Sequence, residues 1–126
     1  MKARNVMFAV DHGARLIDLT SARALDAPAV RATAAYSMPA GVGTTARAAD
    51  CFALGVLLYE LTTARLPYGA NGPVHSYELH PVRRPMEPAA ARLLAAATAM
   101  LEAAGGLPQG LSHFADVIES VSAPVA

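Results

Sequence analysis

The chain has 126 residues, enough for one domain, and its ten basic and ten acidic residues cancel at neutral pH. Because there is no net positive charge, the composition gives no electrostatic argument for binding nucleic acid or an acidic membrane surface. Apolar residues make up 54% of the chain, but many are alanines, which favour helix and bury little area. Cys51 is the only cysteine, so we expect a small packed residue there rather than a nucleophile, a disulfide or a metal ligand.

The first part of the chain contains two short apolar segments. Residues 6–10 read Val-Met-Phe-Ala-Val, and Leu16 and Ile17 follow after Asp11-His12-Gly13. Strand-like segments on both sides of an Asp-x-Gly turn predict a β-hairpin. The first ten residues have no apolar run long enough for a signal peptide, so we expect a cytoplasmic protein.

Between residues 20 and 47 the hydrophobic periodicity disappears, and small residues and proline dominate. A loop of this length in a compact domain is usually functional or mobile. It contains Thr33, Thr44 and Thr45. A phosphate on one of them would order the loop by pairing with Arg31 or Arg47, whereas the alternative is that all three are ordinary solvated threonines.

Residues 50–68 contain the most apolar stretch of the chain. Six large side chains leave no wide polar stripe at the helical period: Phe52, Leu54, Val56, Leu57, Leu58 and Leu61. The pattern predicts a central helix buried on most sides, with Asp50 as its N-cap and Pro67 preventing its continuation. A helix of roughly 13 residues spans about 20 Å, too short for a hydrocarbon core of about 30 Å, so we expect no membrane span.

The last part of the chain predicts two further helices. Residues 69–88 form a connector rich in proline and glycine, with one short helix near residues 74–79. Pro88 opens a helix over residues 89–104, and Gly105-Gly106 ends it. One face of that helix carries Leu93, Leu94, Ala97, Met100 and Leu101. A final amphipathic helix over residues 111–121 presents Leu111, Phe114, Val117, Ile118 and Val121.

Four motifs occur in the same order as in a protein kinase. Residues 2–8 place Lys2 and Asn5 before a strand, as at the end of the kinase catalytic loop. Residues 16–20 look like the strand and Asp-Phe-Gly motif, with Asp18 in the metal-binding place. Residues 32–40 are similar to the end of the activation segment, and residues 50–68 to the central helix with its following Gly-x-x-Pro-(Phe/Tyr).

The chain therefore resembles the C-terminal lobe of a serine/threonine protein kinase. This resemblance implies an α+β fold, mainly α, in which residues 1–126 form a partial kinase-like domain. Its parts would be an N-terminal β-hairpin, an activation-segment-like loop over residues 19–47, a buried central helix and two C-terminal helices.

The resemblance also implies a set of site residues. Asn5 and Asp18 would be vestigial Mg²⁺ ligands and Lys2 a vestigial phosphate contact. The alternative is that Asn5 begins a strand and Asp18 ends one at a turn. Asp50 would accept hydrogen bonds from the catalytic-loop backbone, or act as a helix cap alone.

The four histidines have no metal-ligand spacing: His12, His75, His80 and His113.

Several family features are absent from the 126 residues. They contain no Gly-x-Gly-x-x-Gly and no Val-Ala-Ile-Lys motif, and the family's catalytic Asp would lie two residues before Lys2. Thr20 replaces the Gly of Asp-Phe-Gly, while Ala40 and a position about Leu107 replace a Glu–Arg pair. We expect no cofactor on the isolated chain, and ATP with Mg²⁺ if a nucleotide-binding lobe completes it.

Three functions remain open at this point. The first is a truncated or degenerate kinase homologue that does not transfer phosphate alone. The second is the C-terminal part of an active kinase whose start codon is misassigned or whose gene is split. The third is a non-catalytic helical module that binds a partner protein, or a second copy, through the surface that an N-terminal lobe would cover.

Overall fold

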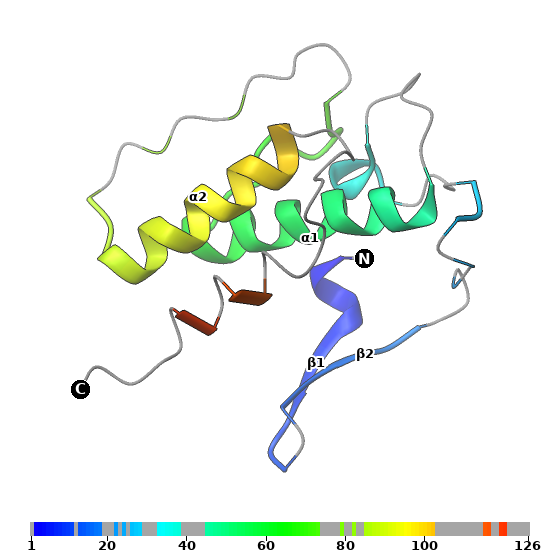
Figure 1. Ribbon diagram of the computed structural model, residues 1–126, viewed down its shortest axis with the longest axis horizontal. Coiled ribbons are helices and arrows are strands. Elements are labelled where there is room, and N and C mark those ends of the chain that lie inside the picture. Colours follow the sequence, from blue (N-terminus) through cyan, green and yellow to red (C-terminus); the bar gives the residue numbers. More distant parts are fainter. Residues whose placement is uncertain are drawn as a thin grey trace.

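The computed structural model describes residues 2–11, 13–18, 22, 24, 26–28, 33–38, 45–73, 79, 82, 85–102, 115–116 and 119–120. Its elements, in chain order, are η1 (Ala3–Asn5), β1 (Val6–Ala9), β2 (Gly13–Leu16), η2 (Ala34–Tyr36), α1 (Ala46–Thr63) and α2 (Pro88–Glu102). The two α-helices lie side by side as the body of the molecule, and the β-hairpin projects from it (Figure 1). The described part of the chain is therefore a small α+β fold that is mainly helical.

Helix α1 begins earlier than its sequence pattern predicts. Thr45 has extended backbone angles, and its side chain accepts a hydrogen bond from the Ala48 N–H at 3.3 Å. A threonine hydroxyl satisfies a free first-turn N–H as a carboxylate would, and the alanines that follow favour helix. The prediction that Asp50 is the N-cap is therefore wrong. Asp50 lies inside the helix, on its second turn, and is exposed.

The end of α1 is set by local backbone geometry before Pro67 is reached. Ala64 adopts a left-handed conformation, with φ 57° and ψ 23°, and its N–H bonds to the Glu60 carbonyl at 2.8 Å. The Thr63 hydroxyl donates to the Tyr59 carbonyl at 2.7 Å. The Ala64 N–H thereby satisfies one of the last four carbonyl groups of the helix, which have no partner within it. The chain then turns through Pro67, which is almost fully buried.

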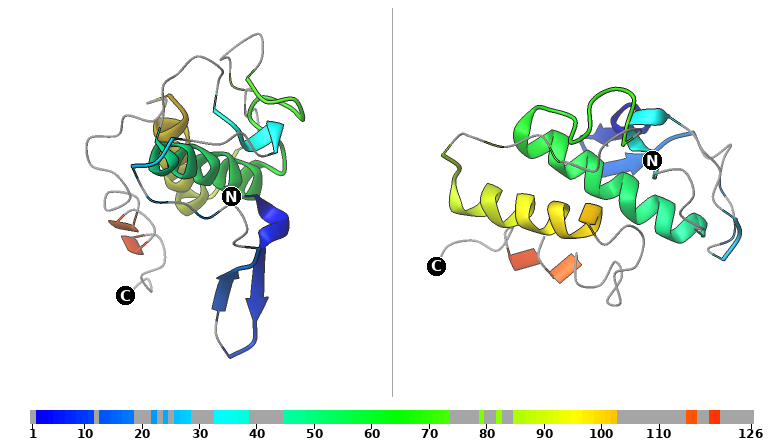
Figure 2. Two further views of the ribbon diagram at one scale, coloured as in Figure 1. Left: turned by 90° about the vertical axis from the view of Figure 1, so that its right-hand side faces the viewer. Right: turned by 90° about the horizontal axis from the view of Figure 1, so that it is seen from above.

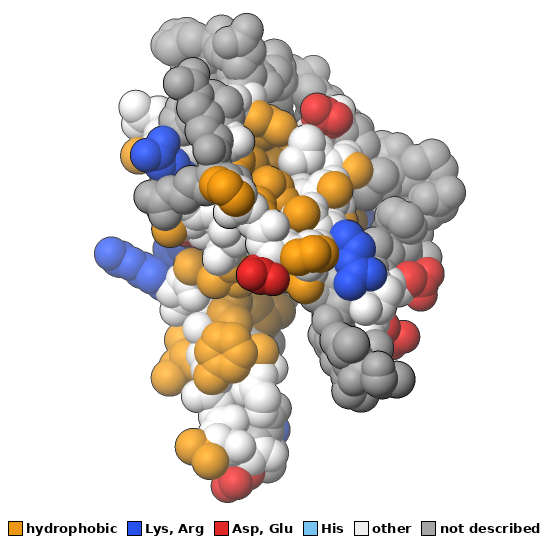
Figure 3. All heavy atoms as spheres, turned by 90° about the vertical axis from the view of Figure 1, so that its left-hand side faces the viewer, with side chains coloured by type: hydrophobic (Ala, Val, Ile, Leu, Met, Phe, Trp, Pro, Cys, Tyr) orange, Lys and Arg blue, Asp and Glu red, His pale blue; other side chains and the backbone are white. Residues whose placement is uncertain are grey.

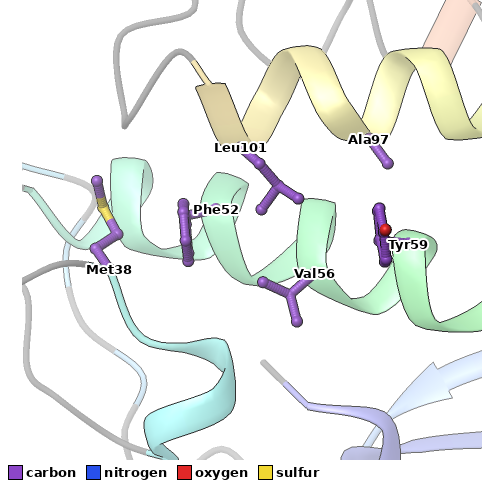
Figure 4. Close-up of a cluster of buried hydrophobic side chains, with 6 residues drawn as sticks. All are labelled: Met38, Phe52, Val56, Tyr59, Ala97 and Leu101. Atoms are coloured by element: carbon purple, nitrogen blue, oxygen red, sulfur yellow. The ribbon is translucent and has the colours of Figure 1, made fainter. Parts of the chain in front are cut away.

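The core forms where α1 packs on α2 and on the segment after η2. Its buried members are Met38, Phe52, Val56, Tyr59, Ala97 and Leu101 (Figure 4). Gly55 permits the close approach of the two helices, because a Cβ atom there would lie 3.1 Å from the Met100 Cβ and 3.3 Å from the Ala97 carbonyl oxygen. The α1 surface is less completely covered than predicted. Leu54 and Leu58 are half-buried, and Leu61 is 68% exposed.

Helix α2 agrees closely with its sequence pattern. It begins at Pro88, in the first turn of the helix where a missing N–H costs nothing, and extends to Glu102. Ala97, Met100 and Leu101 are buried, and the remaining two members of the predicted face are half-buried. The short helix near residues 74–79 and most of the helix over residues 111–121 lie outside the described residues. Within the latter, Ala115, Asp116, Glu119 and Ser120 are helical and exposed.

The predicted hairpin is confirmed. Strands β1 and β2 pair antiparallel, with Val6 opposite Leu16 and Phe8 opposite Ala14. Gly13 begins β2 with φ 67°, a conformation that glycine adopts without steric cost. The left view of Figure 2 shows the hairpin extending away from the helices.

Candidate functional site

The hairpin register brings Asn5 and Asp18 to the same end of the hairpin. The Ile17 N–H donates to the Asn5 carbonyl at 2.8 Å, which continues the strand pairing one step beyond Val6 and Leu16. The Asn5 N–H donates a hydrogen bond to the Lys2 carbonyl at 3.0 Å, across η1. Asp18 follows Ile17 directly. Residues separated by 13 positions in the sequence are thus neighbours, and Lys2 lies in the segment that leads into them.

Asp18 has an unusual backbone conformation. Its φ is 62°, in the left-handed region that few residues other than glycine adopt. Aspartate tolerates this region better than most residues, but the conformation still costs about 1 kcal/mol or more. Such residues are concentrated at functional sites, where the surrounding structure holds them. Asp18 lies two residues after the end of β2, next to the residue that is bonded to Asn5.

Asn5 and Asp18 carry oxygen donors of the type that hard cations prefer. Asn5 offers an amide oxygen and Asp18 a carboxylate, and Mg²⁺ binds through oxygen ligands, often with only one or two protein groups beside phosphate and water. Asp18 is exposed and Asn5 half-buried. Within the described residues there is no group of three or more His, Cys, Asp or Glu side chains that could hold a metal ion. A cation at Asn5 and Asp18 therefore needs further oxygen ligands from a bound phosphate or from water.

A second set of contacts fastens the segment around η2 to α1. The Tyr36 hydroxyl donates a hydrogen bond to a carboxylate oxygen of Glu60. Burial raises the pKa of Tyr36 to about 12, helped by the hydrogen bond to Glu60 and opposed by one with the backbone of Ala3. The Ser37 hydroxyl donates to the Thr33 carbonyl at 2.9 Å. Sequence patterns did not reveal this link, although Glu60 is the only acidic residue between Phe52 and Thr63.

The turn after α1 supports the same segment. Gly72 has φ 69°, and a Cβ atom there would overlap the carbonyl oxygen of Ala34. Farther along, the Ala46 N–H donates to the Ala27 carbonyl at 2.7 Å, beside the bridge between Pro28 and Thr45. The predicted activation-segment-like loop is therefore tied to α1 near both η2 and the start of the helix.

The remaining candidates have structural roles where they are described. Cys51 is half-buried and packs in the second cluster of α1 and α2. Burial raises the pKa of the Cys51 thiol, and Asp50 adds to this while Arg47 opposes it. Because the thiolate is the reactive form, a raised pKa agrees with a packing role.

The three threonines considered as phosphate acceptors have different environments. Thr33 precedes η2 and is half-buried, and Thr45 is the α1 cap. Several other residues that the sequence singled out lie outside the described ones: Thr44, the four histidines, Thr20, Ala40 and Leu107.

No protein-family model, curated protein or solved structure matches the chain. Among the helices that the structure describes, none has both the length and the apolar character needed to cross a lipid bilayer.

Proposed function

We propose that the chain is the C-terminal-lobe part of a serine/threonine protein-kinase-like domain, with Asn5 and Asp18 as Mg²⁺ ligands. The observation that carries this proposal is the 2.8 Å bond between the Ile17 N–H and the Asn5 carbonyl. It supports the proposal because it sets the backbone of Asn5 beside Ile17, one residue before Asp18, so two oxygen-bearing residues from separate segments lie at one end of the hairpin. The left-handed Asp18 adds support, since strained backbone is typical of functional sites.

The packing of the rest of the chain is consistent with this role. Tyr36 of η2 is linked both to the backbone of Ala3, near Asn5, and to Glu60 on α1. In a kinase-like domain this link would hold the metal-binding end of the hairpin near the segment that contacts the protein substrate. Helix α1 would be the rigid element to which both are attached.

We further propose that these 126 residues do not transfer phosphate alone. Phosphoryl transfer of this type depends on positioning the nucleotide and neutralising its charge, which needs a glycine-rich loop, a strand lysine and a catalytic aspartate. Those motifs are not among the 126 residues. A lobe that supplies them would bring ATP and Mg²⁺ to Asn5 and Asp18.

Phosphate transfer from Mg·ATP to a serine/threonine peptide tests the proposal. The 126-residue chain is compared with the same chain preceded, in frame, by the coding sequence upstream of Met1. We expect no transfer by the short form and transfer by the extended form. In the extended form, Asp18→Ala is expected to lower kcat by about 10²-fold or more, because it removes a metal ligand.

Asp116→Ala is the matched control, since Asp116 is also an exposed aspartate but belongs to the C-terminal part of the chain, outside the hairpin and the activation-segment-like loop. Its turnover is expected to stay at the wild-type value. Unchanged turnover in Asp18→Ala would show that the metal assignment is wrong. If the reading frame upstream of Met1 encodes no His-Arg-Asp and no Val-Ala-x-Lys motif, the chain is not part of an active kinase. The degenerate kinase homologue would then be the reading that stands.

A non-catalytic interaction module is the second candidate function. The observation that favours it is the set of exposed large apolar side chains on the projecting hairpin (Figure 3), among which Phe8 is 81% exposed. Exposed apolar surface of this kind marks interaction sites in soluble proteins.

A further inference from the structure

The turn after α1 has the sequence Gly69-Ala70-Asn71-Gly72. The Gly72 N–H donates to the Gly69 carbonyl at 3.2 Å, which is the hydrogen bond of a β-turn with Asn71 at its third position. Asn71 is exposed, whereas Gly72 and the following Pro73 are buried. The turn therefore presents an asparagine side chain to water directly before a packed glycine.

An asparagine followed by glycine has a specific backbone chemistry. The backbone nitrogen of the second residue is close enough to attack the side-chain carbonyl carbon of the first, which closes a succinimide ring. Gly72 has no Cβ atom to shield its nitrogen. The exposed Asn71 side chain is accessible to the water that opens the ring. Both reactants of the sequence are thus present in this turn.

The other asparagine of the chain, Asn5, lacks these features. It is followed by Val6, whose β-branched side chain crowds the backbone nitrogen. The Val6 N–H is also bonded to the Ala3 carbonyl at the end of η1. The chain therefore contains one asparagine suited to ring closure and one that is not.

We propose that Asn71 is a site of spontaneous deamidation and isomerisation, and that its isoaspartate product releases the turn from η2. The Gly72 nitrogen loses its proton and forms a bond to the Asn71 Cγ, and the side-chain nitrogen leaves as ammonia. One water then opens the ring. Opening at Cγ gives aspartate with the original backbone, and opening at the Asn71 backbone carbonyl gives isoaspartate. No oxidant, reductant or cofactor takes part.

The Gly72 nitrogen must leave its hydrogen bond before it can attack. That bond, at 3.2 Å, is at the long end of the usual range for N–H···O bonds. It belongs to a surface turn in which Ala70 and Asn71 are both exposed, and such segments open locally at low free energy. Local opening of the turn, without global unfolding, is therefore enough for the reaction.

The isoaspartate product changes the packing because Gly72 lies against η2. A Cβ atom at Gly72 would already overlap the carbonyl oxygen of Ala34. Isoaspartate routes the main chain through Cβ and Cγ, which lengthens the turn by one carbon atom, roughly 1.5 Å. Close-packed segments do not absorb added atoms without moving, so the turn and η2 separate. This inference does not depend on the proposed kinase-like function.

Peptide mass spectrometry of the folded chain, aged at physiological temperature and mildly alkaline pH, tests the site. We expect the peptide that contains Asn71 to show the mass of the amide-to-acid change, as an aspartate and an isoaspartate form that electron-transfer fragmentation distinguishes. Asn5 is the internal control and is expected to stay unchanged. Asn71→Gln is expected to abolish the conversion, because its longer side chain closes a less favourable ring. No conversion at Asn71, or equal conversion at Asn5, would overturn the proposal.

Hydrogen exchange of the separated isoaspartate form tests the release of η2. The Tyr36 and Ser37 N–H groups bond within η2, to the carbonyls of Thr33 and Ala34. We expect these two amides to exchange several-fold faster in the isoaspartate form, and the amides of α2 to stay at the wild-type rate. Asn71→Asp is the matched control, since it adds the same charge without lengthening the backbone, and it is expected to exchange like the wild type. An isoaspartate form with wild-type exchange, or equal acceleration in Asn71→Asp, would contradict the release.

Discussion

The Tyr36 hydroxyl donates a hydrogen bond to the Glu60 carboxylate, and this bond joins η2 to the second half of α1. The two residues are 24 positions apart. A hydrogen bond to a charged group is stronger than one between neutral groups. The bond therefore gives the η2 segment one strong and specific attachment to the helical core.

Replacement of Tyr36 by Phe should measure the strength of this attachment. We expect the free energy of unfolding in urea to fall by about 1–2 kcal/mol, because the half-buried carboxylate loses its donor. Tyr68→Phe is the matched control. Its ring stacks on Phe52 at 6.1 Å and stays in place, so we expect a clearly smaller loss. Equal losses in the two variants would contradict a special role for the Tyr36–Glu60 bond.

The raised pKa of Tyr36 predicts a loss of stability in alkaline solution. The folded pKa is about 12, against 10.0 for the free side chain. Above pH 10.0 the unfolded chain loses the phenolic proton while the folded chain keeps it, so the free energy of unfolding falls as pH rises. The contribution is fully present below pH 10.0 and disappears as the pH approaches 12.

Urea unfolding between about pH 8 and pH 11.5 measures this dependence. Burial also raises the pKa of Tyr59 and of Tyr68, so Tyr36→Phe is expected to reduce the alkaline slope without abolishing it. A slope that is the same in the wild type and the variant would show that Tyr36 does not titrate in this way.

Alanine substitutions at Gly72 and Gly13 distinguish the stability cost of backbone strain from the stability cost of steric overlap. Both have φ between 67° and 69°, but a Cβ atom would overlap the Ala34 carbonyl at Gly72 and would meet nothing within 4 Å at Gly13. We expect Gly13→Ala to cost about 1 kcal/mol from strain alone. Gly72→Ala should cost about 3 kcal/mol, because the turn and η2 must also move apart. Thermal and urea unfolding of the two variants provide the comparison, and equal costs would argue against contact between Gly72 and Ala34.

Phe52 and Phe8 are the same residue type in opposite environments. Phe52 is 1% exposed in the core between α1 and α2, and Phe8 is 81% exposed. We expect Phe52→Ala to lower the free energy of unfolding by about 3–5 kcal/mol through the cavity that it leaves. Phe8→Ala should change it by less than about 0.5 kcal/mol when measured at low protein concentration. A large loss in Phe8→Ala would mean that the Phe8 side chain is covered in solution.

The sequence alone predicted the elements whose patterns are local. The Asp-x-Gly turn between two apolar segments indicated the hairpin, and Pro88 with its apolar stripe indicated α2, because turn chemistry and helical period are properties of neighbouring residues. The apolar character of α1 was also evident. Its start was misplaced by a few residues, because Asp50 and Thr45 are both good caps and the alanines between them have no periodic pattern.

The tertiary structure alone decided which surfaces are covered and which distant residues meet. The exposure of Leu61 and of Phe8, the Tyr36–Glu60 bond and the close approach at Gly55 all depend on segments far apart in the chain. The position of Asn5 beside Ile17 and Asp18 follows from the strand register. A periodic pattern shows that a face is apolar, but what lies against that face is set by how the whole chain packs.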